Sequence, residues 1–202
     1  MSTVVATMSI SLDGIGSGVH QTEERPFGEV PPEALHSWMF ETPDENRAEI
    51  DAIVDAGAFI MGRNMFGPVR GEWDRDWRGW WGPNPPYHAP VFVLTHHPRE
   101  SLEMEGGTTF HFVTDGIHAA LERAHEVAGG RNIHVAGGVS TTNEFLAAGL
   151  IDELMLQITP NILGGGLRLF EGVGPVRLEQ IAGRPASLAT HVRYRVLPAE
   201  GA

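Results

Sequence analysis

Hydrophobic residues along this chain follow two alternating patterns. Short runs that are almost wholly apolar predict buried strands, and they occupy residues 4–10, 58–61, 91–94, 110–113, 132–136 and 154–159. Between them, apolar residues recur every three to four positions and predict helices, at residues 32–40, 42–57, 115–128 and 141–148. An alternation of strands and helices is typical of an α/β domain.

Capping signals give the expected ends of two helices. Thr42 with Glu45 forms a capping-box pattern, Pro43 fits the first helical position, and Gly57 is expected to close that helix. A second capping box is expected from Thr141 with Glu144. We therefore expect helices that begin at Thr42 and Thr141.

The remaining segments complete the expected architecture. Residues 15–32 read as a loop, and residues 70–90 form a long irregular stretch that is rich in tryptophan. Two late apolar runs, at 176–181 and 188–196, have no helix between them and predict a hairpin. The pattern predicts one domain over residues 1–202, with a mixed sheet of seven or eight strands and four or five helices on both faces.

The amino-acid composition excludes several kinds of catalytic chemistry. The 202 residues include neither cysteine nor lysine, so all 14 basic residues are arginines, and thiolate, Schiff-base and P-loop lysine chemistry are excluded. The net charge of −12 offers no basic face for nucleic acid, and no apolar run could span a bilayer. The first residues lack a signal-peptide pattern, so we expect a cytoplasmic protein. The ten histidines show no metal-ligand spacing, and we expect no metal.

Three strand ends carry candidate anion-binding residues. Arg63 stands at a strand-to-helix turn, where helix N–H groups and a guanidinium suit a phosphate. Gly137 and Gly138 follow a buried strand and allow close approach of a ligand to the backbone, without forming a full dinucleotide fingerprint. Thr95 and His96 end another strand and suit a phosphate or a ribose. Taken singly, each is also compatible with an ordinary turn or a polar strand end.

Two carboxylates and an aromatic cluster are further candidates. Asp13 follows the first strand and Glu33 lies in the first predicted helix, so either could donate a proton, although turn and solvent-facing roles are the plainer alternatives. Aromatic residues can form a pocket wall around a flat heterocycle or cover a core, and they gather here at Trp73, Trp77, Trp80, Trp81 and Tyr87.

The order of these motifs is more specific than any one of them. It runs through Ser11-Leu12-Asp13-Gly14, Met61-Gly62-Arg63, Leu94-Thr95-His96, Ala136-Gly137-Gly138 and Leu163-Gly164-Gly165-Gly166. From about Val4 to Val196 the chain resembles the dihydrofolate reductase-like superfamily. In particular, it is similar to the reductase domain of the bifunctional riboflavin-biosynthesis deaminase–reductase and to its stand-alone bacterial relatives.

The resemblance implies a three-layer α/β/α fold with a mixed, mainly parallel sheet and a C-terminal antiparallel hairpin. It also implies NADPH as the cofactor, held across the carboxyl ends of the strands. The residues that would bind NADPH are Gly62, Arg63, Asn64, Thr95, His96, Gly137, Gly138, Val139 and Ser140.

The same resemblance implies hydride transfer to a C=N or C=O group of a small heterocycle, as in 5-amino-6-(5-phosphoribosylamino)uracil reductase. Asp13, or an ordered water near it, would supply the proton. Relatives pair the late strands across a two-fold axis, so a homodimer is expected. The residues on the substrate side would be Ile10, Gly14, Glu33, Trp81, Thr159, Leu163 and Gly164.

Departures from the family pattern keep two alternatives open. The position near the 2′-phosphate, often an arginine in relatives, carries His96 here, and the chain has no lysine to anchor a substrate phosphate. The zinc motif of the deaminase needs cysteines, so the chain is not the bifunctional enzyme. Glu33 lies near the position of the carboxylate with which dihydrofolate reductases bind their substrate. Dihydrofolate reduction is therefore the first alternative. A dimeric ligand-binding module without catalysis is the second.

Overall fold

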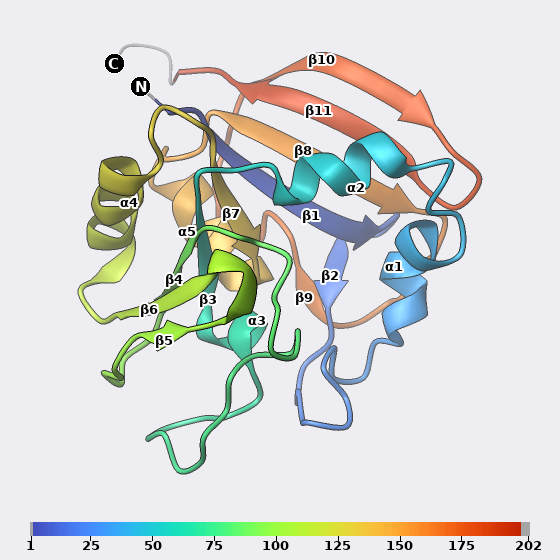
Figure 1. Ribbon diagram of the computed structural model, residues 1–202. Helices are drawn as coiled ribbons and strands as arrows, with labels where there is room; N and C mark the ends of the chain where they lie inside the picture. The colour runs from blue at the N-terminus through green and yellow to red at the C-terminus, as the bar shows by residue number, and fades with distance from the viewer. Residues whose placement is uncertain (1, 199–202) are drawn as a thin grey trace.

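The computed structural model describes residues 2–198 and shows a central nine-stranded sheet with helices on both faces (Figure 1). The strand order is β10-β11-β8-β1-β7-β3-β4-β6-β5, with parallel pairing from β8 through β6 and antiparallel pairing at both ends. The strands are β1 Val4–Ser11, β3 Ala58–Gly62, β4 Pro90–Leu94, β5 Leu102–Glu103, β6 Thr109–Val113, β7 Ile133–Gly137, β8 Glu153–Thr159, β10 Leu178–Pro185 and β11 Thr190–Val196. The sheet is mixed and mainly parallel, as predicted.

Helices cover both faces of this sheet. They are α1 Pro32–Phe40, α2 Arg47–Val54, α3 Arg63–Phe66, α4 Gly116–Val127 and α5 Val139–Ala147, with one 3₁₀ turn, η1 Glu105–Gly107. Trp38 of α1 donates a hydrogen bond to Ser9 on one face of β1, whereas Val4 and Ala6 of the same strand join the core beneath α4 and α5. This alternation along β1 produces the predicted three-layer α/β/α arrangement.

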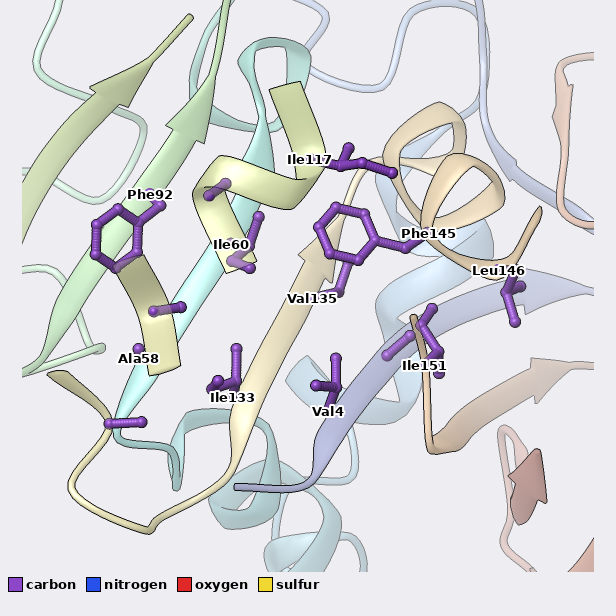
Figure 2. Close-up of a cluster of buried hydrophobic side chains, with 14 of the residues drawn as sticks. Val4, Ala58, Ile60, Phe92, Ile117, Ile133, Val135, Phe145, Leu146 and Ile151 are labelled. Carbon is purple, nitrogen blue, oxygen red and sulfur yellow. The ribbon is translucent and has the colours of Figure 1, made fainter. Parts of the chain in front are cut away.

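The larger hydrophobic core fills the space between the sheet and the helices α4 and α5 (Figure 2). Phe145 of α5 is fully buried beside Ile60 and Val135 of the central strands. On the opposite face, β3 contributes Phe59 and Met61 to a second core. Because successive side chains of β3 enter different cores, this strand is buried on both faces and reads as an unbroken apolar run.

Three short strands were not predicted. β2 (Ile15–Ser17) lies within residues 15–32, which were expected to be a loop, and pairs antiparallel with β9 (Leu167–Arg168) as a separate two-stranded sheet. β5 is only two residues long. Strands of two or three residues are too short to show a period of two, so only their long-range partners define them.

The first capping-box prediction is wrong. Helix α2 begins at Arg47, with Asn46 at the N-cap position and no side-chain cap. The Thr42 hydroxyl instead donates to the Trp38 carbonyl at the end of α1, and Glu45 accepts hydrogen bonds from Ser187 at the tip of the β10–β11 hairpin. Thr42 and Glu45 therefore join the segment between α1 and α2 to other elements and do not cap α2.

Two further helix boundaries differ from expectation. Helix α5 begins at Val139, with Gly138 as its N-cap residue, so Thr141 lies inside the helix and does not cap it. Gly57 does not close α2, which ends at Val54. Its role is steric, because a Cβ atom there would stand 2.2 Å from the Ala128 carbonyl oxygen. The backbones before β3 and after α4 approach each other at this glycine.

The predicted C-terminal hairpin is present, although its first strand begins two residues and ends four residues later than expected, and its second strand begins two residues later. Its strands β10 and β11 pair from Leu178 with Val196 to Pro185 with Thr190. Arg184 of β10 binds both carboxylate oxygens of Glu49 in α2 at 2.8 Å. The hairpin is thus fastened to the helical layer that carries α1 and α2. No helix within residues 2–198 is long and apolar enough to cross a membrane.

Candidate functional site

Most of the predicted site residues gather at one edge of the sheet, where the parallel strands end. This follows from topology, because strands that run in parallel bring their carboxyl ends to the same edge. The last residues of the four strands concerned are Ser11, Gly62, Leu94 and Gly137. Residues from four distant parts of the sequence are thereby brought to one edge.

Arg63 and Thr95 are in direct contact at one end of this edge. Arg63 Nη1 donates to Thr95 Oγ1 at 3.2 Å, and Arg63 Nε donates to the Val69 carbonyl at 3.1 Å. The third guanidinium nitrogen, Nη2, is buried and has no hydrogen-bond partner within residues 2–198. Burial, with Arg70 and Arg99 nearby, lowers the pKa of Arg63. A buried donor without a partner is costly, so this nitrogen is well placed to bind an anion.

A tryptophan of the irregular segment covers the Arg63 guanidinium. The Cζ atom of Arg63 lies 3.8 Å from the centroid of the Trp73 ring, within the range of a cation–π interaction. The indole Nε1 of Trp73 donates to the His97 carbonyl at 2.9 Å, which fixes the ring beside the end of β4. His96 and Asn64 are exposed at the same end of the site, and neither forms a side-chain hydrogen bond within the described chain.

In the middle of the edge, two consecutive glycines leave the backbone uncovered by side chains of their own. Gly137 and Gly138 are joined by a cis peptide bond, and α5 begins directly after them. A Cβ atom on Gly138 would have no neighbour within 4 Å, so the space in front of it is open. Val139 is buried, whereas Ser140 is exposed at the first turn of α5. Unpaired N–H groups at the start of a helix attract negatively charged groups.

Gly62 serves packing rather than direct ligand approach. A Cβ atom there would stand 2.3 Å from the Thr141 hydroxyl oxygen of α5. The end of β3 and the first turn of α5 therefore lie in close contact. This glycine lets the Arg63 turn and the Gly138 turn stand side by side, which is an indirect contribution to the site.

At the opposite end of the edge, Asp13 holds two loops together. Its carboxylate accepts hydrogen bonds from the Ser11 hydroxyl at 2.6 Å, the Leu163 N–H at 3.0 Å and the Gly164 N–H at 2.8 Å. The Ser11 hydroxyl, followed by these two backbone N–H groups, lowers the pKa of Asp13 to about 2. Donors that bind the charged form of a carboxylate favour ionisation.

This environment does not support Asp13 itself as the proton donor. A carboxylate with a pKa of about 2 is ionised at neutral pH and has no proton to give. The carboxylate instead ties the turn after β1 to the turn after β8. The other half of the prediction, an ordered water near Asp13, stays a prediction.

Other substrate-side residues line the apolar interior beside Asp13. Ile10 packs with Met8 and Val139 in one cluster, and Leu163 packs against Ile15 and Leu35 in another. The Thr159 hydroxyl is buried and donates toward the Ile10 and Ala34 carbonyls, at 3.3 and 2.9 Å. The structure thus places Thr159 as a tie between β8, β1 and α1. Gly14 and Gly164 are the turn residues on either side of the Asp13 contact.

Glu33 lies near Thr159, whereas Trp81 lies apart from this group. Glu33 is exposed on α1 and borders a hollow of about 360 Å³ together with Thr159 and Asn161. Trp81 packs against Tyr87 and stacks on Phe110, where it covers the second core. The structure shows no contact between either side chain and the Asp13 carboxylate.

Two residues beside the site, Gly16 and Arg168, were missed by sequence reasoning, whereas Trp73 was expected only as one member of the aromatic cluster. A Cβ atom on Gly16 would stand 2.8 Å from Val139, so β2 lies against the start of α5. Arg168 donates from Nη1 to the Asp13 carbonyl. The only available signal for Arg168 was its position two residues after the glycine run. Among residues 2–198 there is no group of three His, Asp or Glu side chains that could hold a metal ion.

Comparison with known proteins agrees with this architecture. The family model described as the RibD C-terminal domain matches residues 2–188. A putative riboflavin biosynthesis protein from Shewanella sp. PV-4 has a similar structure, with a TM-score of 0.65 and 22% identity over 97% of this chain and 99% of that chain. Dihydrofolate reductase from Enterococcus faecalis, solved with NADP(H), superposes with a TM-score of 0.57 at 15% identity, over 96% of each chain. These likenesses establish the fold.

One curated relative is also similar in sequence. The uncharacterized protein YwjB of Bacillus subtilis is 36% identical over 79 residues, which is 39% of this chain and 42% of that protein. The match therefore spans less than half of the relative. The family model, in contrast, matches almost the whole chain. The chain belongs to the RibD C-terminal domain family, a family of reductase-type domains with the dihydrofolate reductase-like fold.

Proposed function

We propose that this protein is an NADPH-dependent reductase of the riboflavin-biosynthesis type. It transfers a hydride to a C=N or C=O group of a small heterocycle related to 5-amino-6-(5-phosphoribosylamino)uracil. The observation that carries the proposal is the buried Nη2 of Arg63, a cationic donor without a partner at the carboxyl edge of the sheet. Membership of the RibD C-terminal domain family supports reduction as the class of reaction.

The residues present fit a dinucleotide along this edge. Arg63 and Thr95 would hold the phosphate on the adenosine side, because the guanidinium and the hydroxyl already stand together. The open backbone at Gly138 and the first turn of α5 would receive the pyrophosphate. Bound NADPH would supply a hydride from C4 of its nicotinamide ring.

The residues on the proposed substrate side would orient the substrate and exclude water from it. Ile10, Val139 and Leu163 present apolar surface near the carboxyl end of β1. The ionised Asp13 fixes the loop that carries Leu163 and Gly164. The proton that balances hydride transfer comes from solvent, since Asp13 holds none at neutral pH.

Oxidation of NADPH, followed by absorbance, tests this function. The protein is mixed with NADPH and a panel of heterocyclic imines and carbonyl compounds, including 5-amino-6-(5-phosphoribosylamino)uracil and dihydrofolate. We expect turnover of at least one imine or carbonyl compound, and the dihydrofolate arm separates the alternative activity. A folded protein that binds NADPH but turns over no member would favour the binding-module alternative.

The variant Gly138→Leu tests the position of the cofactor. Gly138 has an extended backbone, with φ of −76°, and a Cβ atom there would enter open space, so the variant is expected to fold. Its side chain would occupy the proposed pyrophosphate position and reduce NADPH affinity by about 100-fold or more. Gly165→Leu is the matched control, because Gly165 also faces open space but lies on the substrate side. It should bind NADPH as the wild type does.

We further propose that the protein is a homodimer that pairs through β10. This strand is the edge of the main sheet, and Leu178 and Ile181 are 38% and 37% exposed on it. An uncovered strand edge with apolar side chains favours pairing with a second copy. Sedimentation at micromolar concentration should give twice the 22.0 kDa chain mass, and a monomer would reject the dimer.

A further inference from the structure

The segment that follows α3 is held in shape by arginine side chains. Residues 67–89 of the described chain form no helix or strand, so their backbone groups need other partners. Three guanidiniums supply some of them: Arg63 donates to the Val69 carbonyl, Arg70 to the Gly67 carbonyl and Arg99 to the Trp77 carbonyl. Because Arg63 is also the arginine of the candidate cofactor site, the segment and the site share a side chain.

Within this segment, Trp73 is fixed by several partners. Its indole Nε1 donates to the His97 carbonyl at 2.9 Å. Its ring packs edge-on against Phe66 and Phe112, with centroids 6.0 and 5.1 Å away. The Cζ atom of Arg99 lies 4.8 Å from the centroid of the same ring. The position of the Trp73 ring is therefore set by the protein itself before any ligand binds.

The Trp73 ring fixes the plane of the Arg63 guanidinium. Two hydrogen bonds, to Thr95 and to the Val69 carbonyl, hold the guanidinium at its edge, and the ring lies 3.8 Å from its Cζ atom. Hydrogen bonds act in the plane of a guanidinium, whereas a ring against its face stops it from tilting. The Nη2 atom, which has no partner within residues 2–198, is thereby kept in one position. A donor held in its bound position loses less entropy when a ligand arrives.

Trp77 shows what the same residue type does in this segment without a guanidinium on its ring. It is also half-buried, it also packs against the second core, and its Nε1 donates to the Phe66 carbonyl at 3.0 Å. Among the five tryptophans of the chain, Trp73 is the one whose ring lies against arginines within residues 2–198. Trp77 thus has the packing and the hydrogen bond of Trp73 but not its contact with Arg63.

We propose that Trp73 is a positioning residue that gives the site its selectivity for NADPH over NADH by holding Arg63 in place. The proposal rests on the proposed reductase function and its cofactor. NADPH differs from NADH only in the 2′-phosphate, so a residue that orients the donor for this phosphate changes the ratio of the two affinities. The ring also keeps water from one face of the guanidinium, which strengthens a charge-assisted hydrogen bond.

Calorimetric titration of variants with NADPH and with NADH tests this role without requiring turnover. Trp73→Leu should weaken NADPH binding about 10-fold and NADH binding by no more than about twofold. Trp73→Phe keeps an aromatic face and should recover most of the NADPH affinity. If Trp73→Leu does not fold, Trp73→Met replaces it, because methionine fills space without a π face. Equal weakening of both nucleotides, or unchanged NADPH affinity, would overturn the proposal.

Trp77→Leu is the matched control, because it makes the same exchange in the same segment. It removes an indole that packs on the second core and donates to a carbonyl, but it leaves the Arg63–Trp73 contact intact. The ratio of NADPH to NADH affinity should stay as in the wild type. A ratio that falls as far as in Trp73→Leu would assign the effect to packing of the segment and overturn the proposal.

A double variant tests whether Trp73 acts through Arg63. Arg63→Gln alone should weaken NADPH binding about 10- to 30-fold. If the ring works only by holding this guanidinium, adding Trp73→Leu to Arg63→Gln should cause no further loss. A further loss of about 10-fold would show that the two residues act independently, and the positioning role would be rejected.

Two smaller nucleotides separate this proposal from the proposed function. The wild type should bind adenosine 2′,5′-bisphosphate more tightly than adenosine 5′-phosphate, which lacks only the 2′-phosphate, and Trp73→Leu should remove most of that preference. A wild type without the preference would overturn the proposal. If the preference depends on Trp73 but no heterocycle is reduced by NADPH, the reductase function fails while the role of Trp73 stands.

Discussion

Two arginines at different ends of the molecule show opposite uses of the same side chain. Arg184, on the C-terminal hairpin, binds both oxygens of Glu49 and also donates to Asn46 Oδ1 at 3.0 Å. Arg63, at the cofactor end of the site, donates to Thr95 and to a carbonyl but keeps a buried nitrogen without a partner. One guanidinium is paired with a carboxylate inside the fold, whereas the other keeps a buried donor without a partner.

Polar residues that stabilise the fold differ from candidate ligand-binding residues in how many of their donors and acceptors are paired. Around Arg184, His191 Nε2 also donates to Asn46 Oδ1 at 2.8 Å, so the guanidinium, the Glu49 carboxylate and the amide oxygen are paired, although His191 Nδ1 is buried without a hydrogen-bond partner within residues 2–198. Such a network stabilises the fold but has little left to offer a ligand. Around Arg63 the protein tolerates an unmet donor, which costs stability and is expected where a ligand completes the bonding.

The largest expected effect on stability comes from breaking the ion pair between Arg184 and Glu49. Glu49→Gln would leave Arg184 without its carboxylate, whose side chain is only 17% exposed. We expect a loss of about 2 kcal/mol in the free energy of unfolding, measured by urea titration, because a charge-assisted pair loses one partner. NADPH affinity should stay within about twofold of the wild type. Normal stability together with impaired NADPH binding would reverse the comparison.

The next largest effect is expected at Arg63, whose Nη2 has no hydrogen-bond partner within residues 2–198. Arg63→Gln should weaken NADPH binding about 10- to 30-fold, because a charge-assisted bond to a phosphate is lost. The effect on NADH should be smaller, since Arg63 and Thr95 are expected to face the additional 2′-phosphate. The free energy of unfolding should change little, because the loss of the bonds to Val69 and Thr95 is offset by the removal of an unmet buried donor. A clear loss of stability with unchanged cofactor affinity would show that Arg63 is structural.

Asp13 gives a pH-dependent version of the same comparison. Its pKa is lowered to about 2 in the fold, so its stabilising contribution is complete above the ordinary carboxyl value near 4 and is lost as the pH falls through about 2. Asp13→Asn should therefore melt below the wild type at pH 6, and the two melting temperatures should converge between pH 4 and pH 2. A constant difference over that range would contradict the ionised clamp. The pH profile of turnover should show no step from Asp13 above pH 4.

The smallest effect is expected where two surface loops meet. Arg75 contacts Glu23 at 3.2 Å, and Arg70 donates to Gln21 at 2.6 Å, so residues 67–80 touch residues 18–31. Both members of the Arg75–Glu23 pair are more than half exposed. Arg75→Ala should change stability by less than about 0.5 kcal/mol, because exposed pairs are screened by water and salt. A larger loss in urea titration would mean that these loops are part of the cooperative core.

Elements with strong local signals could be predicted from the sequence. Helix α1 was expected at residues 32–40 and spans Pro32–Phe40, and the strands of the parallel core were placed within one or two residues. The capping boxes failed because tertiary partners compete for the same side chains. Glu45, for example, accepts hydrogen bonds from Ser187, 142 residues further along the chain. Local sequence contains no information about that partner.

The site was predictable in place but not in chemistry. Strand-end motifs brought Arg63 and Thr95 to one edge, where the structure joins them. The state of Asp13 could be foreseen only in part: the Ser11 hydroxyl, which lowers its pKa most, is two residues away, but the Leu163 and Gly164 N–H groups that lower it further are about 150 residues away. Arg168 was missed for the same reason, since its place beside Asp13 follows from the pairing of β2 with β9.

Binding of NADPH at the Arg63 end of the site is tested most directly by titrating the wild-type protein with NADPH and, in parallel, with NADH, followed by tryptophan fluorescence. Trp73 lies on the Arg63 guanidinium and should report binding, so Trp73→Phe should lose much of the signal. We predict saturable quenching by NADPH, with an affinity at least about 10-fold tighter than for NADH. Equal affinities, or no binding of either nucleotide by the folded protein, would contradict it.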